Sequence, residues 1–393
     1  MVELYGRRWT RRDVAAHAGD STQFFGVRLV TLGDGLERGV RMLEFRTGSG
    51  LRFTVMVDRG FDVGDCEHNG RSVGWHSAAG FPHPGLHEVE GEGGLGWLRG
   101  FSGLLATCGL DHFGFMEQED ASRYRYPPRT HTDFTLHGRV AMLPARLLGY
   151  GEVWDGDECT LYAEGEVRQA AVFAEHLVLV RRVEARVGTD GFTIRDRVVN
   201  RGFARTPHML CYHINVGHPA LAEGSRYLAP IENVVWASHA HRMRDHGTGY
   251  RTLPGPQPAF VEQVWEHIMA ADADGRTPVA VVNDAMGFGF QIETRRSELP
   301  VALQWQNFQP NDYCMGIEPA TNHVKGNGFA RDRGELIELE YGEDRRYTLA
   351  CTVLPDSAAI AAAERRIRAI GPQPDEDFPE PTGRWDDLQI LRT

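Results

Sequence analysis

Short apolar runs separated by turn residues fill most of this sequence, and this pattern constrains the fold more than any other feature. The run 51–57 alternates apolar with other side chains, which is typical of a half-buried strand. Strand-length runs also follow one another between residues 146 and 200, with turns such as 188–191 between them. Strands and helices do not alternate as they do in βαβ folds. The sequence therefore predicts an all-β fold, a large antiparallel β-sandwich with a few short helices.

Further strands are predicted along the whole chain. They lie at 25–36, 40–48, 101–110, 161–167, 172–184, 192–200, 209–216, 279–283, 287–294, 301–308, 336–341 and 346–354. The segment 101–110 also fits a short packed helix. The segment 76–96 is rich in glycine, proline and histidine and has no periodicity, and the segment 111–133 is polar and aromatic. A loop as long as 76–96 in a compact protein more often has a function than none.

The chain shows no internal repeat and no linker between its strands. One long helix is predicted at 357–370, because polar N-cap residues precede it and Gly371 can end it. Large sandwiches can run as single units. We therefore predict one domain over 1–393, with its core at about 26–354 and a helix and irregular arm at 355–393.

Composition and charge exclude several partners. The formal net charge of −12 argues against a nucleic acid or an anionic membrane surface. No run approaches the roughly 18 to 20 apolar residues of a membrane span, and the N-terminus lacks the apolar region of a secretory signal. The cysteines are far apart and form no CxxC pair, which favours free, mostly buried thiols in a cytoplasmic protein. They are Cys66, Cys108, Cys159, Cys211, Cys314 and Cys351.

The stretch 307–322, NFQPNDYCMGIEPATN, carries the first candidate for chemistry. Glu318 stands there between Ile317 and Pro319, after the apolar run 301–308. We expect an acid held close to the core and flanked by turn residues. Burial would raise its pKa toward the range of a general base. The alternative is an exposed glutamate in a loop.

Three further side chains are candidates because they follow or interrupt strand-like runs. His137 lies in LHGR, His213 in CYHIN and Arg59 in DRGFD. Imidazole titrates near neutrality, so two histidines and a carboxylate suffice to move a proton from one substrate oxygen to another. Each residue also has an ordinary structural reading: His213 as a core histidine, His137 as a turn residue, and Arg59 as part of a surface ion pair.

Several motifs together resemble one known family. They are DRGFDV (58–63), FSGLLATCGL (101–110), LHGRV (136–140), HMLCYHINVGHP (208–219) and QNFQPNDYCMGIEPATN (306–322). In this order they resemble the bacterial aldose 1-epimerase-like family of the galactose mutarotase superfamily, over most of the chain. The resemblance implies a large antiparallel sandwich with a sugar site on its concave face, and an isomerase that interconverts the anomers of a free sugar without a cofactor.

The resemblance also implies roles for individual residues. Glu318 would take the proton from the anomeric hydroxyl, His213 would protonate the ring oxygen, and His137 would assist at that oxygen. Amides bind hydroxyls and aromatic faces stack on sugar rings, so further substrate contacts are expected. The expected contact residues are Asp58, Arg59, Asn215, Trp305 and Gln306.

Two departures leave other functions open. The second-histidine motif reads YHIN where galactose mutarotases have a form like HTYFN, and the loops 76–96 and 111–133 are insertions. The same residues could epimerise a keto sugar or eliminate a 3-keto glycoside, chemistry that often recruits a divalent metal. A third possibility is a sugar-binding module without activity.

No histidine pattern here argues for a metal site. Most histidines are scattered, and the HAH at 239–241 lies beside arginines, so we predict a solvated loop there and no metal ligands. The expected partner is a small carbohydrate, and a homodimer is left open. The scattered histidines are His83, His87, His112, His131, His208 and His218.

Overall fold

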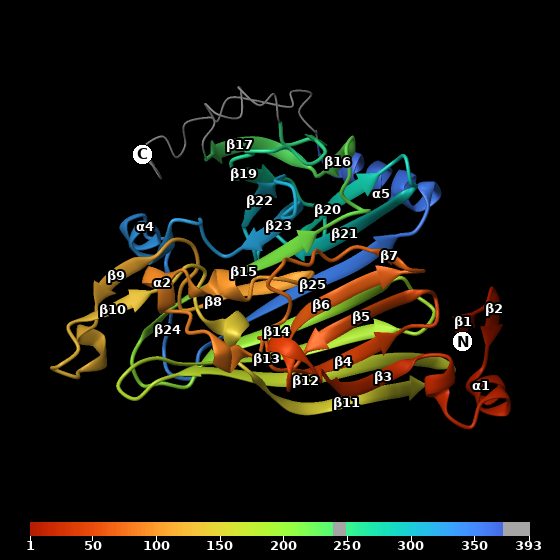
Figure 1. Ribbon diagram of the computed structural model, residues 1–393, viewed down its shortest axis with the longest axis horizontal. Helices are drawn as coiled ribbons and strands as arrows, with labels where there is room; N and C mark the ends of the chain where they lie inside the picture. Colours follow the sequence, from red (N-terminus) through yellow and green to blue (C-terminus); the bar gives the residue numbers. More distant parts are fainter. Residues whose placement is uncertain (239–248, 372–393) are drawn as a thin grey trace.

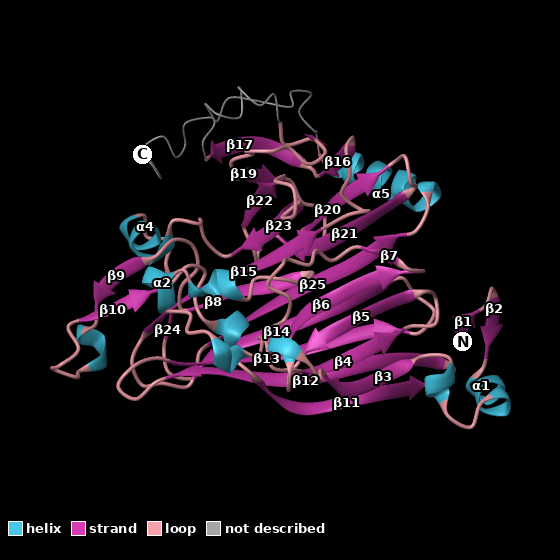
Figure 2. Ribbon diagram, in the orientation of Figure 1, coloured by secondary structure: helices cyan, strands magenta, loops and turns pink. Residues whose placement is uncertain are grey.

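The computed structural model describes residues 1–238 and 249–371, and it consists mostly of antiparallel sheets (Figures 1 and 2). A nine-stranded sheet and a seven-stranded sheet make up most of it, and a five-stranded sheet completes the layers. The predicted all-β architecture, a large antiparallel β-sandwich with a few short helices, is confirmed.

The nine-stranded sheet contains the longest strands. Its order is β11 (Ala145–Asp155), β12 (Glu158–Ala170), β13 (His176–Arg186), β14 (Gly191–Asn200), β25 (Asp344–Leu354), β21 (Phe288–Arg295), β20 (Arg276–Asn283), β16 (Ser225–Leu228) and β18 (Thr252–Leu253). The meander β11 to β14 matches the strand-length runs predicted between residues 146 and 200, although the strands extend further than those runs. Strand β25, from the far end of the chain, pairs with both β14 and β21.

The seven-stranded sheet carries the motifs that the sequence singled out. Its order is β17 (Ile231–Ala237), β19 (Gln263–Met269), β22 (Val301–Asn307), β23 (Cys314–Ala320), β15 (Thr206–Val216) and β24 (Ile337–Leu339), and β8 (Leu105–Leu110) also pairs with β15. The register joins Cys211 of β15 to Ala320 of β23 and to Cys108 of β8. Strand β15 therefore lies between the two, and all of its residues are buried.

The remaining elements are smaller. The five-stranded sheet holds β3 (Gly26–Thr31), β4 (Arg41–Arg46), β5 (Leu51–Met56), β6 (Asp62–His68) and β7 (Arg71–Ser72), and two hairpins join β1 (Val2–Leu4) to β2 (Arg7–Trp9) and β9 (Glu117–Asp120) to β10 (His131–Phe134). The helices described are α1 (Arg11–His17), α2 (Gly91–Gly94), α4 (Gly326–Asp332) and α5 (Ser357–Ile370). Short 3-10 turns lie at Ser21–Gln23, Gly35–Glu37, Pro84–Leu86, Gly96–Arg99, Ser122–Tyr124 and Val140–Met142.

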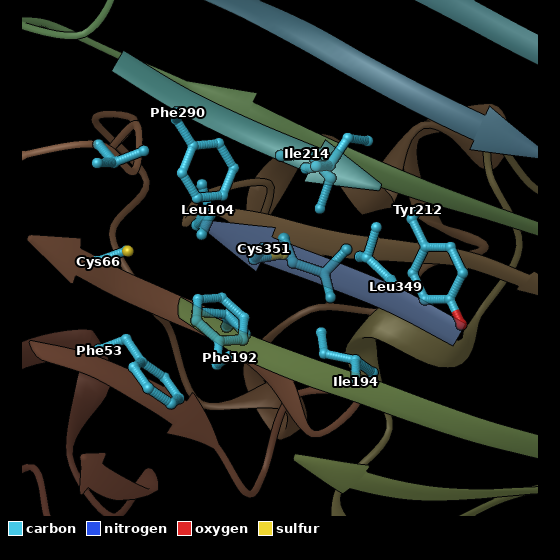
Figure 3. Close-up of a cluster of buried hydrophobic side chains, with 14 of the residues drawn as sticks. Phe53, Cys66, Leu104, Phe192, Ile194, Tyr212, Ile214, Phe290, Leu349 and Cys351 are labelled. Atoms are coloured by element: carbon cyan, nitrogen blue, oxygen red, sulfur yellow. The ribbon is translucent and has the colours of Figure 1, made fainter. Parts of the chain in front are cut away.

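The main core lies between the inner faces of the three sheets (Figure 3). Phe53 of β5 stacks on Phe192 of β14 with ring centroids 4.4 Å apart, and Ile214 of β15 joins the same cluster. A side chain from each sheet therefore contributes to one apolar interior, and its removal from water is the dominant favourable term in folding.

A fully buried arginine sits within this interior. Arg181 of β13 holds Asp196 of β14 through two hydrogen bonds of 2.9 and 2.6 Å, and it also pairs with Asp62 of β6. Its guanidinium donates to Thr107 of β8, and Tyr212 of β15 donates to Asp196 at 2.7 Å. Because these residues come from three sheets, one ionic network connects all of them at the centre of the core.

Most predicted strand positions are occupied by strands, and the predicted helix 357–370 has the predicted bounds. The segment 101–110 is a strand only from Leu105 onward, and it is not a helix. The run 51–57 is not half-buried as predicted: β5 exposes Arg52 alone, because both of its faces are covered. Glu318 was expected between turn residues, but it lies inside β23, where Pro319 pairs with Ala302 of β22.

All six cysteines are free and buried, as predicted. The irregular arm expected after the helix, at 372–393, and the HAH segment at 239–241 lie outside the described residues. Across the described residues, the helices are too short or too polar to cross a membrane.

Candidate active site

The candidate site lies on the outer face of the seven-stranded sheet, opposite the main core. Successive residues of a strand point to opposite faces, so Met209, Cys211 and His213 of β15 face outward, whereas Tyr212 and Ile214 face the core. Loops cover this outer face and form a second apolar cluster with it. In Figure 1, α2, α4 and the hairpin β9–β10 lie together beside β8 and β24.

A cavity of about 530 Å³ opens between the sheet and these loops. This volume falls within the range of small-molecule sites in proteins. Its aromatic lining consists of Trp75, Trp97, Phe101, Phe115 and Trp305. Its polar side chains are Ser77, His137, His213, Glu262, Asn307, Asp312 and Glu318. The three residues predicted to carry catalysis therefore line one common space.

His213 and Glu318 lie side by side on neighbouring strands. The register that pairs Ile214 of β15 with Ile317 of β23 brings them together, and Nε2 of His213 is 3.1 Å from Oε1 of Glu318. Both side chains are only 4% exposed. The distance suits a hydrogen bond, but the angles do not, so a small rotation of either group is needed before a proton can pass between them.

Asn215 fixes the tautomer of His213. Its Nδ2 donates to the carbonyl oxygen of Gly103 at 3.0 Å, so its Oδ1 faces Nδ1 of His213 at 2.6 Å. An amide oxygen only accepts, and Nδ1 must therefore carry the hydrogen. The neutral imidazole then presents the lone pair of Nε2 to Glu318. Asn215 is a positioning residue, and the structure does not place it at the cavity as a sugar contact.

Burial controls the protonation of this pair. Removal from water, together with the smaller effect of the Glu262 carboxylate, raises the pKa of Glu318 to about 8. Removal from water lowers the pKa of His213 to about 4, against the opposing effect of Asn215. At neutral pH the pair therefore holds one proton, on the carboxyl group. Such displaced pKa values are common at active sites.

His137 lies in a turn and lines the cavity. Its φ of 58° and that of Gly138, 75°, are both left-handed, and a Cβ at Gly138 would collide with the carbonyl oxygens of Gly109 and His112. This requirement explains why a glycine follows His137 in the sequence. The His137 ring lies 5.8 Å from that of His213 and 4.7 Å from Trp97, between centroids. Burial, with His213 and His112 nearby, holds its pKa well below the usual value.

Gly316 makes room for the pair. A Cβ at this position of β23 would lie 2.6 Å from Oε1 of Glu318 and 3.2 Å from Cε1 of His213. We expect Gly316→Ala to push the carboxyl group of Glu318 away from the imidazole of His213. The kcat of a reaction that depends on proton transfer by this pair should fall about 100-fold, since small misplacements have effects of this size. Overpacking should cost about 1–3 kcal/mol of stability. Gly149→Ala, in β11, is the matched control, because its Cβ would meet nothing closer than 3.9 Å. Equal kcat values for the two variants would contradict this account.

Trp305 and Gln306, the two predicted contact residues on β22, point to opposite faces of the strand. Trp305 lines the cavity, and its Nε1 donates to Glu262 at 2.9 Å. Gln306 points to the other face and donates to the carbonyl oxygen of Gly249 at 3.1 Å. Neighbours in a strand cannot both face one ligand. Asn307, two residues after Trp305, does line the cavity. The two-residue period of a strand could have identified Asn307 as a cavity residue from the sequence.

Asp58 and Arg59 lie away from the cavity. Asp58 is held by Arg41, with Nη2 and Oδ1 2.5 Å apart. Arg59 is buried, and it donates to the carbonyl oxygens of Pro82 and Gly100. Both side chains hold loops in place, and the structure does not bring them to the sugar position that the sequence suggested.

Sequence reasoning missed much of the cavity wall. Trp75, Trp97 and Phe101 surround the histidines, with the Phe101 ring 4.9 Å from that of His213. Trp75 and Trp97 lie just before and just after the loop 76–96, and Phe101 precedes the observed strand, so no periodic pattern assigned a direction to these side chains. No group of three or more histidine, cysteine or acidic side chains suitable for a metal occurs in the part of the chain that the structure describes.

Sequence and structure comparisons agree with this architecture. The family described as Domain of unknown function (DUF4432) matches residues 37–353. The chain belongs to this family. A search of curated proteins finds no significant match.

Solved structures show which fold the family shares. A candidate aldose 1-epimerase from Klebsiella pneumoniae is 27% identical, with a TM-score of 0.79 over 91% of this chain and 90% of that one. A galactose mutarotase-like protein from Clostridium acetobutylicum is 12% identical, with a TM-score of 0.55 over 84% and 99%. Galactose 1-epimerase from Lactobacillus acidophilus is 11% identical, with a TM-score of 0.50 over 83% and 98%. The fold of this DUF4432 protein is that of galactose mutarotase-like proteins.

Proposed function

We propose that this DUF4432 protein is an isomerase that interconverts the anomers of a free sugar by acid–base catalysis. The contact between His213 and Glu318, 3.1 Å apart at a cavity that His137 also lines, is the observation that supports this most directly. Anomer exchange needs a group that takes the proton of the anomeric hydroxyl and another that protonates the ring oxygen. A pair that shares one proton can do both.

The proposed steps follow from where that proton rests. In the resting pair it is on Glu318, because burial opposes a charge there. Transfer to Nε2 of His213 gives a carboxylate beside an imidazolium. Glu318 then takes the proton of the anomeric hydroxyl while His213 protonates the ring oxygen, with His137 assisting at that oxygen. The ring opens, the aldehyde turns about its bond to the next carbon, and the reverse steps close the other anomer.

The pH dependence should report the single proton of this pair. With the pKa of Glu318 raised to about 8 and that of His213 lowered to about 4, the one-proton form dominates between these values. Above pH 8 the pair loses its proton. We expect kcat/KM, corrected for spontaneous exchange, to be level from pH 5 to 7.5 and to fall about tenfold per unit well above pH 8. A corrected kcat/KM that rises between pH 7 and 9 would contradict the one-proton pair.

The direct test is anomer exchange followed by NMR on freshly dissolved α-hexoses, pentoses and sugar acids, with and without Mn²⁺. Acceleration above the spontaneous rate supports the proposal. If no sugar is accelerated but sugars raise the melting temperature, the protein is a sugar-binding module. Exchange spectroscopy at equilibrium can extend the screen to sugars whose pure anomers are hard to obtain.

A second candidate is enolisation of a keto sugar, leading to epimerisation or elimination. The raised pKa of Glu318 favours it, since a neutral carboxylic acid in an apolar site can donate a hydrogen bond to an enolate oxygen. Solvent deuterium separates the two reactions. Anomer exchange leaves every carbon-bound hydrogen in place, whereas enolisation in D₂O replaces the hydrogen beside the carbonyl. Deuterium in a recovered 3-keto glycoside, with no acceleration of aldoses, would establish the second reaction.

A further inference from the structure

We propose that the sugar bound at this site carries an uncharged apolar group, which rests against a wall that the two long loops add to the cavity. The inference rests on the proposed function in placing the sugar ring beside His213 and Glu318. It goes further in naming the class of substrate.

The cavity has two parts of different origin. The acid–base pair comes from strands, with His213 on β15 and Glu318 on β23. Another part of the wall comes from the loops 76–96 and 111–133 and the turn that follows the first loop, and its side chains are apolar apart from Ser77, whose hydroxyl donates to the carbonyl oxygen of Phe101. It includes Ala79, Leu95, Leu98, Phe115 and Met116. The two insertions noted in the sequence therefore add an apolar surface to the cavity that His213 and Glu318 line.

This wall keeps large apolar side chains exposed. Leu98 is 50% exposed, Phe115 37% and Met116 44%. Grouped exposed hydrophobic residues at a cavity mark a ligand site, because leaving them in water is unfavourable. The flexible side chain of methionine adapts to ligands of different shape. A sugar hydroxyl would gain no hydrogen bond from these side chains, so an apolar group is the ligand part that suits them.

The size of the cavity also indicates a ligand larger than an unsubstituted sugar. About 530 Å³ would hold roughly 18 waters at the ~30 Å³ that each occupies in the liquid, which exceeds the number of non-hydrogen atoms in a hexose. A hexose at His213 and Glu318 leaves space along the loop wall. That space is large enough for a group the size of a benzene ring.

The charge of the lining argues that this group is neutral. Among the described residues, the lining includes no lysine or arginine, and its charged side chains are acids such as Glu262 and Asp312. A phosphate or carboxylate on the sugar would face these acids without a cation. Ring opening needs a free anomeric hydroxyl, so the apolar group must be attached at another carbon.

Binding and exchange can test this with a panel of mono-O-benzyl ethers. The 2-, 3-, 4- and 6-O-benzyl ethers of D-glucose and D-galactose are compared with the unsubstituted sugars, by calorimetry for Kd and by NMR for anomer exchange. At least one ether should bind about 10- to 100-fold more tightly than its parent sugar, from the apolar area it buries. If every ether binds no better than its parent, or if none of these sugars binds, the inference is wrong.

A pair of variants locates the effect. Leu98→Asp places a charge on the wall and should remove most of the preference for the benzyl ether. Leu86→Asp is the matched control: Leu86 lies in the loop 76–96, before the turn that carries Leu98, and its 51% exposure is close to the 50% of Leu98, but it does not line the cavity. An unchanged preference in Leu98→Asp would also overturn the inference. The Kd ratio decides the substrate class even if no sugar is exchanged, whereas the NMR rates judge the proposed isomerase separately.

Discussion

Glu318→Gln is expected to lower kcat for anomer exchange by about 10³-fold, the size of effect that a lost general acid–base group produces. The amide keeps the shape of the side chain but can neither take nor supply the proton shared with Nε2 of His213, 3.1 Å away. Anomer exchange followed by NMR measures the loss. Glu298→Gln is the matched control, because burial also raises the pKa of Glu298 while its side chain lies away from the cavity.

The same variant should be more stable than the parent protein at pH 7 to 9. Folding raises the pKa of Glu318 to about 8, so unfolding at pH 7 releases a proton, and above pH 8 the folded protein instead has to hold a buried carboxylate; both effects favour unfolding. Glutamine has no such proton, and we expect a gain of several kcal/mol in the free energy of unfolding. Chemical denaturation at pH 8 checks this. A variant with full activity would remove Glu318 from the proposed chemistry, and one with lowered stability would contradict its burial as a neutral acid.

Arg181→Met is expected to cost about 3–5 kcal/mol of unfolding free energy, the usual effect of removing one member of a buried ion pair. The change leaves Asp62 and Asp196 in the core without their shared cation, and Thr107 loses its donor. Burial already raises the pKa of Asp62 in the presence of the arginine. Urea denaturation followed by circular dichroism gives the measurement.

The next residue along β13 provides the control. Arg182 points to the other face, is 33% exposed, and pairs with Glu164 and Glu184. Pairs of this exposure contribute little, so Arg182→Met should change stability by about 1 kcal/mol or less. Equal losses for the two variants would mean that the network joining the three sheets adds nothing beyond an ordinary surface pair.

The architecture was predictable because apolar and polar side chains alternate along many of the strands. Alternating runs predicted most strand positions, and the polar and glycine residues around 357–370 predicted α5 to the residue. The chemistry of Glu318, His213 and His137 was predicted from residue type and family resemblance, and the structure brings these three together. Their local setting was less predictable: a glutamate followed by proline indicates a turn, yet tertiary pairing places Glu318 within β23.

Contacts between distant segments could not be read from the sequence. Arg59 was predicted to contact a sugar or to form a surface ion pair, but its partners are carbonyl groups that follow it by 23 and 41 positions in the chain. Trp97 follows an aperiodic loop, and Phe101 precedes the strand that was predicted to include it, so nothing local indicated that they surround His213. Arg181 is one of several arginines in an alternating strand, and its complete burial depends on carboxylates from two other strands.

Strand β15 gives one face to the main core and the other to the candidate site, and it is hydrogen-bonded on both sides. Exposing the backbone amide of His213 to solvent therefore requires separating β15 from β8 or β23, which is close to unfolding the protein as a whole. The imidazole of His213 and the carboxyl group of Glu318 are therefore held on strands that rarely separate from their neighbours. Adaptation to substrates of different size is consequently left to the covering loops, whose replacement could alter selectivity while the proton-handling groups keep their geometry.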